Sequence, residues 1–242
     1  MVLKNVFCAV CGQKQSISVD DEPFTSELNL ENYEKFKRIN ISRCPSCGYC
    51  SENLGDKVSE RVKTIVETQS YKNLLDYNYM GNQKDLPDQE YLELNIHELE
   101  AYAAVSKEFN NNLIAARVLA KIADLKYMLA NTYIETKYMK DDDDLNADFD
   151  EIIESLFNQA QINNEECLNF LKGIKISDSF CKIFVAERLS FGYFYEQAKQ
   201  IIDKLTKKET FSEDLSKYVE NFLTEVEQRW DICIKFQVIK VS

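Results

Sequence analysis

Two short cysteine motifs in the first quarter of the chain constrain its fold more than any other feature. Cys8-Ala9-Val10-Cys11-Gly12 is followed, some tens of residues later, by Cys44-Pro45-Ser46-Cys47-Gly48. Each C-x-x-C-G turn directs two thiolates at one point, and its glycine takes the positive φ that frees backbone N–H groups to point at sulfur. Four thiolates form a closed tetrahedral shell for Zn²⁺, with no position left for a substrate. We therefore predict a metal site formed by Cys8, Cys11, Cys44 and Cys47.

The ligands alone leave the identity of the metal open. Zinc is the expected ion, but iron in a four-cysteine shell has the same tetrahedral geometry. The pattern C-P-x-C-G-Y at residues 44–49 is also typical of rubredoxin-like iron sites, so iron remains the alternative. Cys50 adds a fifth thiol beside this turn. We interpret it as a small buried side chain, while an alternative ligand and a redox-active neighbour stay open.

The segment that carries the cysteines resembles a zinc ribbon and is predicted to form a separate module over residues 1–55. Residues 15–19 alternate in polarity as a β-strand does. The insert over residues 24–40 is expected to contain a short helix, because three apolar side chains recur there at helical spacing: Leu30, Tyr33 and Phe36. A module this small has little core of its own, so metal binding, worth on the order of 10 kcal/mol, supplies much of its folding free energy.

The rest of the chain is predicted to be helical. With only six glycines and three prolines, the chain lacks the turn residues that an all-β fold requires. Around residues 186–205 the pattern resembles one tetratricopeptide repeat, with Tyr195-Glu196-Gln197-Ala198 at the turn between two helices. No second copy follows at a multiple of the repeat period. We therefore predict a mainly α fold, in which the zinc-ribbon-like β module precedes an irregular tetratricopeptide-like helical domain over residues 56–242.

Apolar periodicity places the individual helices. The expected ranges are residues 58–79, 88–109, 113–138, 148–171, 179–191, 195–205 and 212–230. Residues 232–238 alternate in polarity, a pattern that fits either a short strand or the end of a helix.

The formal charge of −12 is unevenly distributed. Residues 1–55 contain six Lys or Arg and seven Asp or Glu, so nearly all of the negative charge lies on the helical part. Such a surface repels phosphate backbones and disfavours nucleic-acid binding. Nucleic-acid binding by the ribbon alone remains an alternative, because a modest basic stretch lies in that segment: Lys35, Lys37, Arg38 and Arg43.

The chain has no stretch of the ~20 apolar residues that span a bilayer, and its first residues are a poor match to a signal peptide. We therefore expect a cytoplasmic protein without membrane association. A reducing compartment also fits the cysteines, since paired C-x-x-C motifs there indicate metal or redox chemistry rather than disulfides.

No recognisable catalytic constellation accompanies the cysteines. His97 is the only histidine, and we interpret it as a partly exposed bystander on a helix. Neither a GxGxxG, a Walker A nor an HExxH pattern occurs. The sequence thus favours a non-enzymatic protein that binds a protein or peptide partner through its helices and carries a structural zinc site. It predicts neither the identity of the partner nor the oligomeric state.

The two cysteine motifs also carry a resemblance to a known family. Residues 8–12 and 44–49 resemble the paired motifs of an uncharacterised bacterial family, domain of unknown function 2225, which combines them with a tetratricopeptide-like helical region. Ala9 stands where proline is usual, and Cys50 where a small residue such as alanine is expected, but neither change removes a ligand. The resemblance implies a zinc site on Cys8, Cys11, Cys44 and Cys47. It implies no activity, because none is established for the family.

Overall fold

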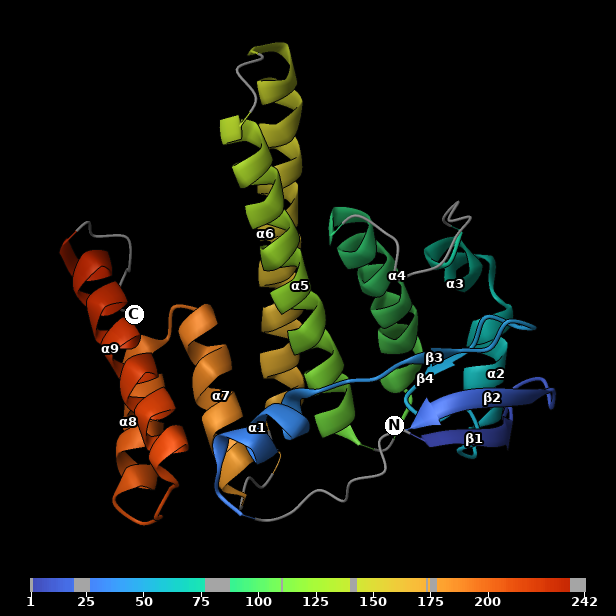
Figure 1. The fold of residues 1–242 in the computed structure, drawn as a ribbon, viewed down its shortest axis with the longest axis horizontal. Helices are drawn as coiled ribbons and strands as arrows, with labels where there is room; N and C mark the ends of the chain where they lie inside the picture. Colours follow the sequence, from blue (N-terminus) through green and yellow to red (C-terminus); the bar gives the residue numbers. More distant parts are fainter. Residues whose placement is uncertain are drawn as a thin grey trace. The chain divides into compact units, whose positions relative to one another are not determined.

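The protein is mainly α, with a small β module near its N-terminus (Figure 1), which confirms the predicted fold class. The structure is a computed structural model that describes residues 2–19, 27–76, 88–109, 111–139, 143–172, 174 and 178–235. The chain divides into two compact units: the first comprises Met1–Asp21 and Ile39–Cys167, and the second comprises Glu22–Arg38 and Leu168–Ser242. Among the described residues, no helix combines the length and the apolar character needed to cross a membrane.

Two antiparallel β-hairpins in the first unit carry the cysteine turns. β1 (Val2–Phe7) pairs with β2 (Lys14–Val19), and the first C-x-x-C-G turn joins them. β3 (Ser42–Arg43) pairs with β4 (Cys50–Ser51), and the second turn lies between these short strands. The strand expected at residues 15–19 is confirmed as part of β2. Each hairpin therefore presents one pair of cysteines at its end.

Five helices follow in the chain: α2 (Glu60–Glu67), α3 (Gln69–Leu74), α4 (Asp88–Ser106), α5 (Asn112–Met139) and α6 (Asp143–Leu171). The helix expected from residue 58 is divided at Thr68, and residues 77–87 lie outside the described part. Thr68 has an extended backbone that ends α2, and its side chain accepts a hydrogen bond from the N–H of Tyr71 as the N-cap of α3. α6 begins at Asp143 rather than at residue 148.

The second hairpin packs against helices of the first unit. Tyr49, Cys50 and Leu54 are fully buried. The Tyr71 hydroxyl on α3 accepts a hydrogen bond from the N–H of Cys50 (3.0 Å) and donates one to the carbonyl of Gly48 (3.2 Å). The predicted domain boundary at residue 55 is a statement about independent folding, and it stays a prediction.

α5 is buried on both sides. Small side chains let it approach its neighbours closely: Ala115, Ala116, Ala120, Ala123 and Ala130 are all buried. Along its other side it lies next to α6 (Figure 1), where Tyr127 packs on Phe157 and Tyr133 on Phe149, with ring centroids 5.7 and 5.6 Å apart. These two aromatic contacts hold α5 and α6 together at two points along their length.

The described helices of the second unit are α1 (Leu30–Lys37), α7 (Ser179–Phe191), α8 (Tyr195–Thr206) and α9 (Glu213–Lys235). α7 and α8 form the antiparallel pair that the repeat-like pattern predicts, and α8 packs on α9. α7 has the predicted bounds because Asp178 caps its start, accepting from the N–H groups of Phe180 and Cys181. α9 extends to Lys235, so the part of the C-terminal tail up to that residue is helical.

The short helix expected within the insert is confirmed as α1, but it belongs to the second unit. Tyr33 is fully buried, and its ring centroid lies 6.1 Å from that of Phe180 on α7 and 5.9 Å from that of Tyr218 on α9. Phe36 packs edge-on against Phe184 of α7 at 5.8 Å. The apolar face of α1 is therefore covered by α7 and α9.

Candidate metal centre

The structure brings the four predicted cysteines together. The Sγ atoms of Cys8, Cys11, Cys44 and Cys47 all lie within 4.8 Å of one another. The distance is 3.7 Å between Cys8 Sγ and Cys47 Sγ, and also 3.7 Å between Cys11 Sγ and Cys44 Sγ. A tetrahedral shell with metal–sulfur bonds of about 2.3 Å places its sulfur atoms about 3.8 Å apart. The cluster can therefore hold a tetrahedral metal ion.

The two turns have matching backbone conformations. Gly12 and Gly48 have φ values of 73° and 79°. In each turn the glycine N–H donates to the carbonyl of the first cysteine, Cys8 or Cys44, at 2.8 Å. An L-residue in this left-handed region costs roughly 1–2 kcal/mol, which explains the glycine that follows each C-x-x-C.

Gln15 connects the two hairpins at the cluster. It lies on β2, and its Nε2 donates a hydrogen bond to the Sγ of Cys44 in the other turn, at 3.5 Å. Donors of this kind orient metal-bound sulfur and stabilise its negative charge. The sequence indicated a strand at this position but gave no sign of the contact, which joins residues from different hairpins.

The environment of Cys8 and Cys47 opposes ionisation of their thiols without a cation. Burial raises the pKa of Cys8 and of Cys47 above the usual range. At Cys44 burial acts in the same direction, but hydrogen bonds from the backbone N–H groups of Cys47 and Ser46 outweigh it, and the pKa is lowered. Four thiolates this close repel one another, and a divalent cation reverses that penalty. The donor set therefore fits a metal ion that binds thiolate, such as zinc or iron.

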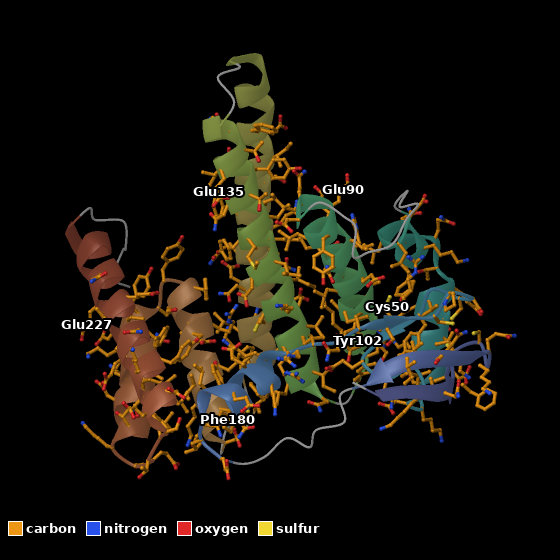
Figure 2. All side chains as sticks on the ribbon, viewed as in Figure 1. Cys50, Glu90, Tyr102, Glu135, Phe180 and Glu227 are labelled. Atoms are coloured by element: carbon orange, nitrogen blue, oxygen red, sulfur yellow. The ribbon has the colours of Figure 1, made fainter. Side chains whose placement is uncertain are left out.

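Cys50, labelled in Figure 2, is not one of the four cysteines of this cluster. Its side chain is fully buried, and its Sγ donates to the carbonyl oxygen of Gly48 at 3.4 Å. Burial raises the pKa of Cys50 to about 12, which keeps the thiol protonated at neutral pH. These observations support the interpretation of Cys50 as a packed side chain and give no support to the two reactive alternatives.

A polar contact missed from the sequence connects the second hairpin to α4 and α5. The hydroxyl of Tyr102 donates to Glu52 Oε2 at 3.4 Å, and Arg117 Nη2 lies 4.0 Å from Glu52 Oε1. Burial raises the pKa of the Glu52 carboxyl, while the Arg117 guanidinium acts in the opposite direction. Only the fold brings these residues together, since they are far apart in the chain.

The other residues singled out from the sequence do not gather at the cluster. His97 is half-buried on α4 and is not part of it. Of the basic stretch, Lys35, Lys37 and Arg38 belong to the second unit and only Arg43 lies on a hairpin. Lys35 pairs with Glu31 and Lys37 with Glu34, each at 3.0 Å.

No family model matches the chain, and neither the curated proteins nor the solved structures include a match. The resemblance to domain of unknown function 2225 therefore stays a prediction. Function has to be argued from the chemistry of the site and of the surface.

Replacing Cys44 by Ser should abolish metal binding, because three thiolates and a hydroxyl do not close the shell. We expect the metal content to fall from about one ion per chain to near zero. Hydrogen exchange should show lost protection in β1–β4 and retained protection in the helices from α2 onward, α7–α9 included.

Cys181→Ser is the matched control. Cys181 lies on α7, outside the cluster, and this variant should keep both metal and protection. If Cys44→Ser also removed protection from α7–α9, the chain would fold as one cooperative core, and the prediction of independent folding would be wrong.

Proposed function

We propose that the protein is a non-enzymatic scaffold that binds a protein or peptide partner and is stabilised by a structural four-cysteine zinc site. The observation that carries this proposal is the cluster of four sulfur atoms within 4.8 Å of one another. A shell closed by four thiolates leaves no coordination position for a substrate or an activated water, which is the property of structural zinc sites. The helices then supply the surface on which a partner binds.

Zinc fits a structural role better than iron does, and such a site requires reduced cysteines. A cytoplasmic location, as the sequence predicts, meets that requirement. Iron in the same shell would make the protein an electron carrier, with the helices as a docking surface for its redox partner. Both metals fit the sulfur geometry, so the test must identify the ion.

Charge favours a protein partner over a nucleic acid. Three of the four basic residues that motivated the nucleic-acid alternative lie in a different unit from the hairpins, and two of them are in ion pairs. Nor does the chain offer a second histidine with which His97 could form an acid–base pair. The proposal therefore rests on binding rather than on catalysis.

Protein purified under reducing conditions should contain about one zinc ion per chain and be colourless. Elemental analysis and visible absorption spectroscopy test this directly. Iron, with its thiolate charge-transfer bands in the visible range, would contradict the structural-zinc part of the proposal and support electron transfer.

Peptide binding can be tested without knowing the partner. A random peptide library displayed on phage, panned against the immobilised 242-residue chain, should enrich sequences that share a motif. Individual peptides from the enriched set should bind in solution with micromolar dissociation constants, about −8 kcal/mol. If no sequence is enriched over an unrelated control protein, the peptide-binding proposal is wrong.

A further inference from the structure

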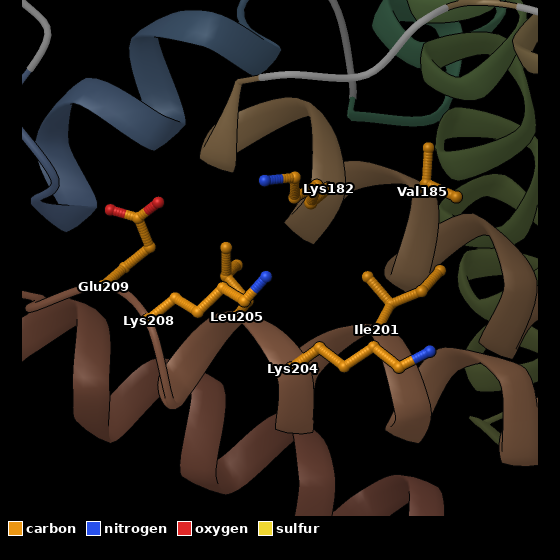
Figure 3. A pocket seen from close by; sticks show the side chains of 7 residues that line it. All are labelled: Lys182, Val185, Ile201, Lys204, Leu205, Lys208 and Glu209. Carbon is orange, nitrogen blue, oxygen red and sulfur yellow. The ribbon is translucent and has the colours of Figure 1, made fainter.

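A pocket of about 330 Å³ lies between α7 and α8 in the second unit (Figure 3). This volume is at the lower end of the ~300–1,000 Å³ that ligand-binding pockets span. Its lining combines apolar and charged side chains: Val185, Ile201 and Leu205, with Lys182, Lys204, Lys208 and Glu209 around them. An apolar floor surrounded mainly by cations is a specific combination, because it favours a ligand that is both apolar and anionic.

The three lysines are available for a ligand. None of Lys182, Lys204 and Lys208 forms an ion pair with another described residue, whereas Lys199 on the same helix as Lys204 pairs with Glu227 at 2.7 Å. Glu209 is the single acidic residue in the lining, so the pocket carries a net positive charge. A cation without a partner gains Coulomb energy from an incoming carboxylate without first breaking an ion pair.

The unit that contains the pocket has no net negative charge that would oppose an acidic ligand. The segments that make up the second unit contain fifteen Lys or Arg and fifteen Asp or Glu. The formal charge of −12 therefore falls entirely on the first unit. Within the second unit, the lysines of the lining are the charges next to a bound ligand, and salt screens the field of groups more than about 10 Å away.

We propose that this pocket binds an acidic peptide segment of a partner protein, with a large apolar side chain inserted between the lysines. This inference rests on the proposed peptide-binding function and names its site and the chemistry of its ligand. Lys204 lies in the last turn of α8, and Lys208 lies two residues beyond the end of that helix at Thr206, so the two lysines line the pocket from α8 and from the segment that follows it. Acidic side chains at alternate positions of an extended peptide are ~6.6 Å apart, so one peptide segment can present carboxylates to more than one of the lysines.

Each part of the pocket has a separate role in binding. Val185 and Ile201 are half-buried, so an inserted side chain removes further apolar surface from water and provides affinity. The lysine stems extend that apolar surface while their ammonium groups face the carboxylates. The charges therefore provide selectivity for acidic peptides and faster association.

The test uses short labelled peptides of equal length and three compositions: Glu with Leu and Phe, Glu with Ser, and Lys with Leu and Phe. Fluorescence anisotropy with the 242-residue chain should show binding of the first peptide at least about tenfold tighter than binding of the other two. Its affinity should fall as NaCl is raised from about 0.05 to 0.5 M, because the Debye length shortens.

Substitutions in the pocket lining test whether the acidic apolar peptide binds there. Lys204→Glu with Lys208→Glu should weaken binding of the acidic apolar peptide at least about tenfold. The neutral variant, Lys204→Gln with Lys208→Gln, should weaken peptide binding less than the Glu variant does. Circular dichroism checks that both variants are folded. Ile201→Ser should weaken peptide binding without altering the dependence of the affinity on salt.

The charge-matched control, Lys72→Glu with Lys217→Glu, changes exposed lysines outside the pocket and should leave peptide binding unchanged.

The outcomes separate this inference from the function on which it rests. If the acidic apolar peptide binds equally well to Lys204→Glu with Lys208→Glu, or if the basic apolar peptide binds best, the assignment of the pocket is overturned while peptide binding stands. If none of the three peptides binds but the phage library is enriched, the inference alone fails. If neither peptides nor library show binding, both the inference and the proposed function are wrong.

Discussion

The close approach of four sulfur atoms is the constraint on which the first unit depends. Two hairpins, one with strands of only two residues, bring Cys8 and Cys11 against Cys44 and Cys47. Two-stranded hairpins are marginally stable in water, and burial raises the pKa of Cys8 and Cys47. A bound divalent cation removes the repulsion between thiolates and contributes folding free energy on the order of 10 kcal/mol. Both hairpins thus converge on the cysteine cluster, while Tyr49 and Leu54 bury apolar surface beside it.

Between the two cysteine turns the chain leaves the first unit and returns to it. The second unit takes up Glu22–Arg38, and within it α1 is held by stacking of Tyr33 on Phe180 and by the contact of Phe36 with Phe184. The residues before and after this insert supply the two cysteine turns, while α1 itself is fixed by aromatic packing within the second unit.

The sequence was sufficient where the chemistry is local. The C-x-x-C-G spacing identified the four cysteines of the cluster, and α7 has its predicted bounds because Asp178 caps it. Long-range contacts were not predictable in the same way. Helical spacing showed that Tyr33 lies on an apolar face but not that α7 and α9 cover it, and nothing in the sequence joined Gln15 to Cys44. The break at Thr68 was missed because apolar periodicity continues across a cap.

A closed structural site has four cysteine sulfurs and no other atom around the metal ion. X-ray absorption spectroscopy at the zinc edge of the purified protein measures both the element and its ligand shell. We expect a zinc signal with four sulfur neighbours at about 2.3 Å. Three or fewer sulfurs with a nitrogen or oxygen neighbour at about 2.0–2.2 Å would indicate an open coordination position, and would contradict the assignment of a closed structural site.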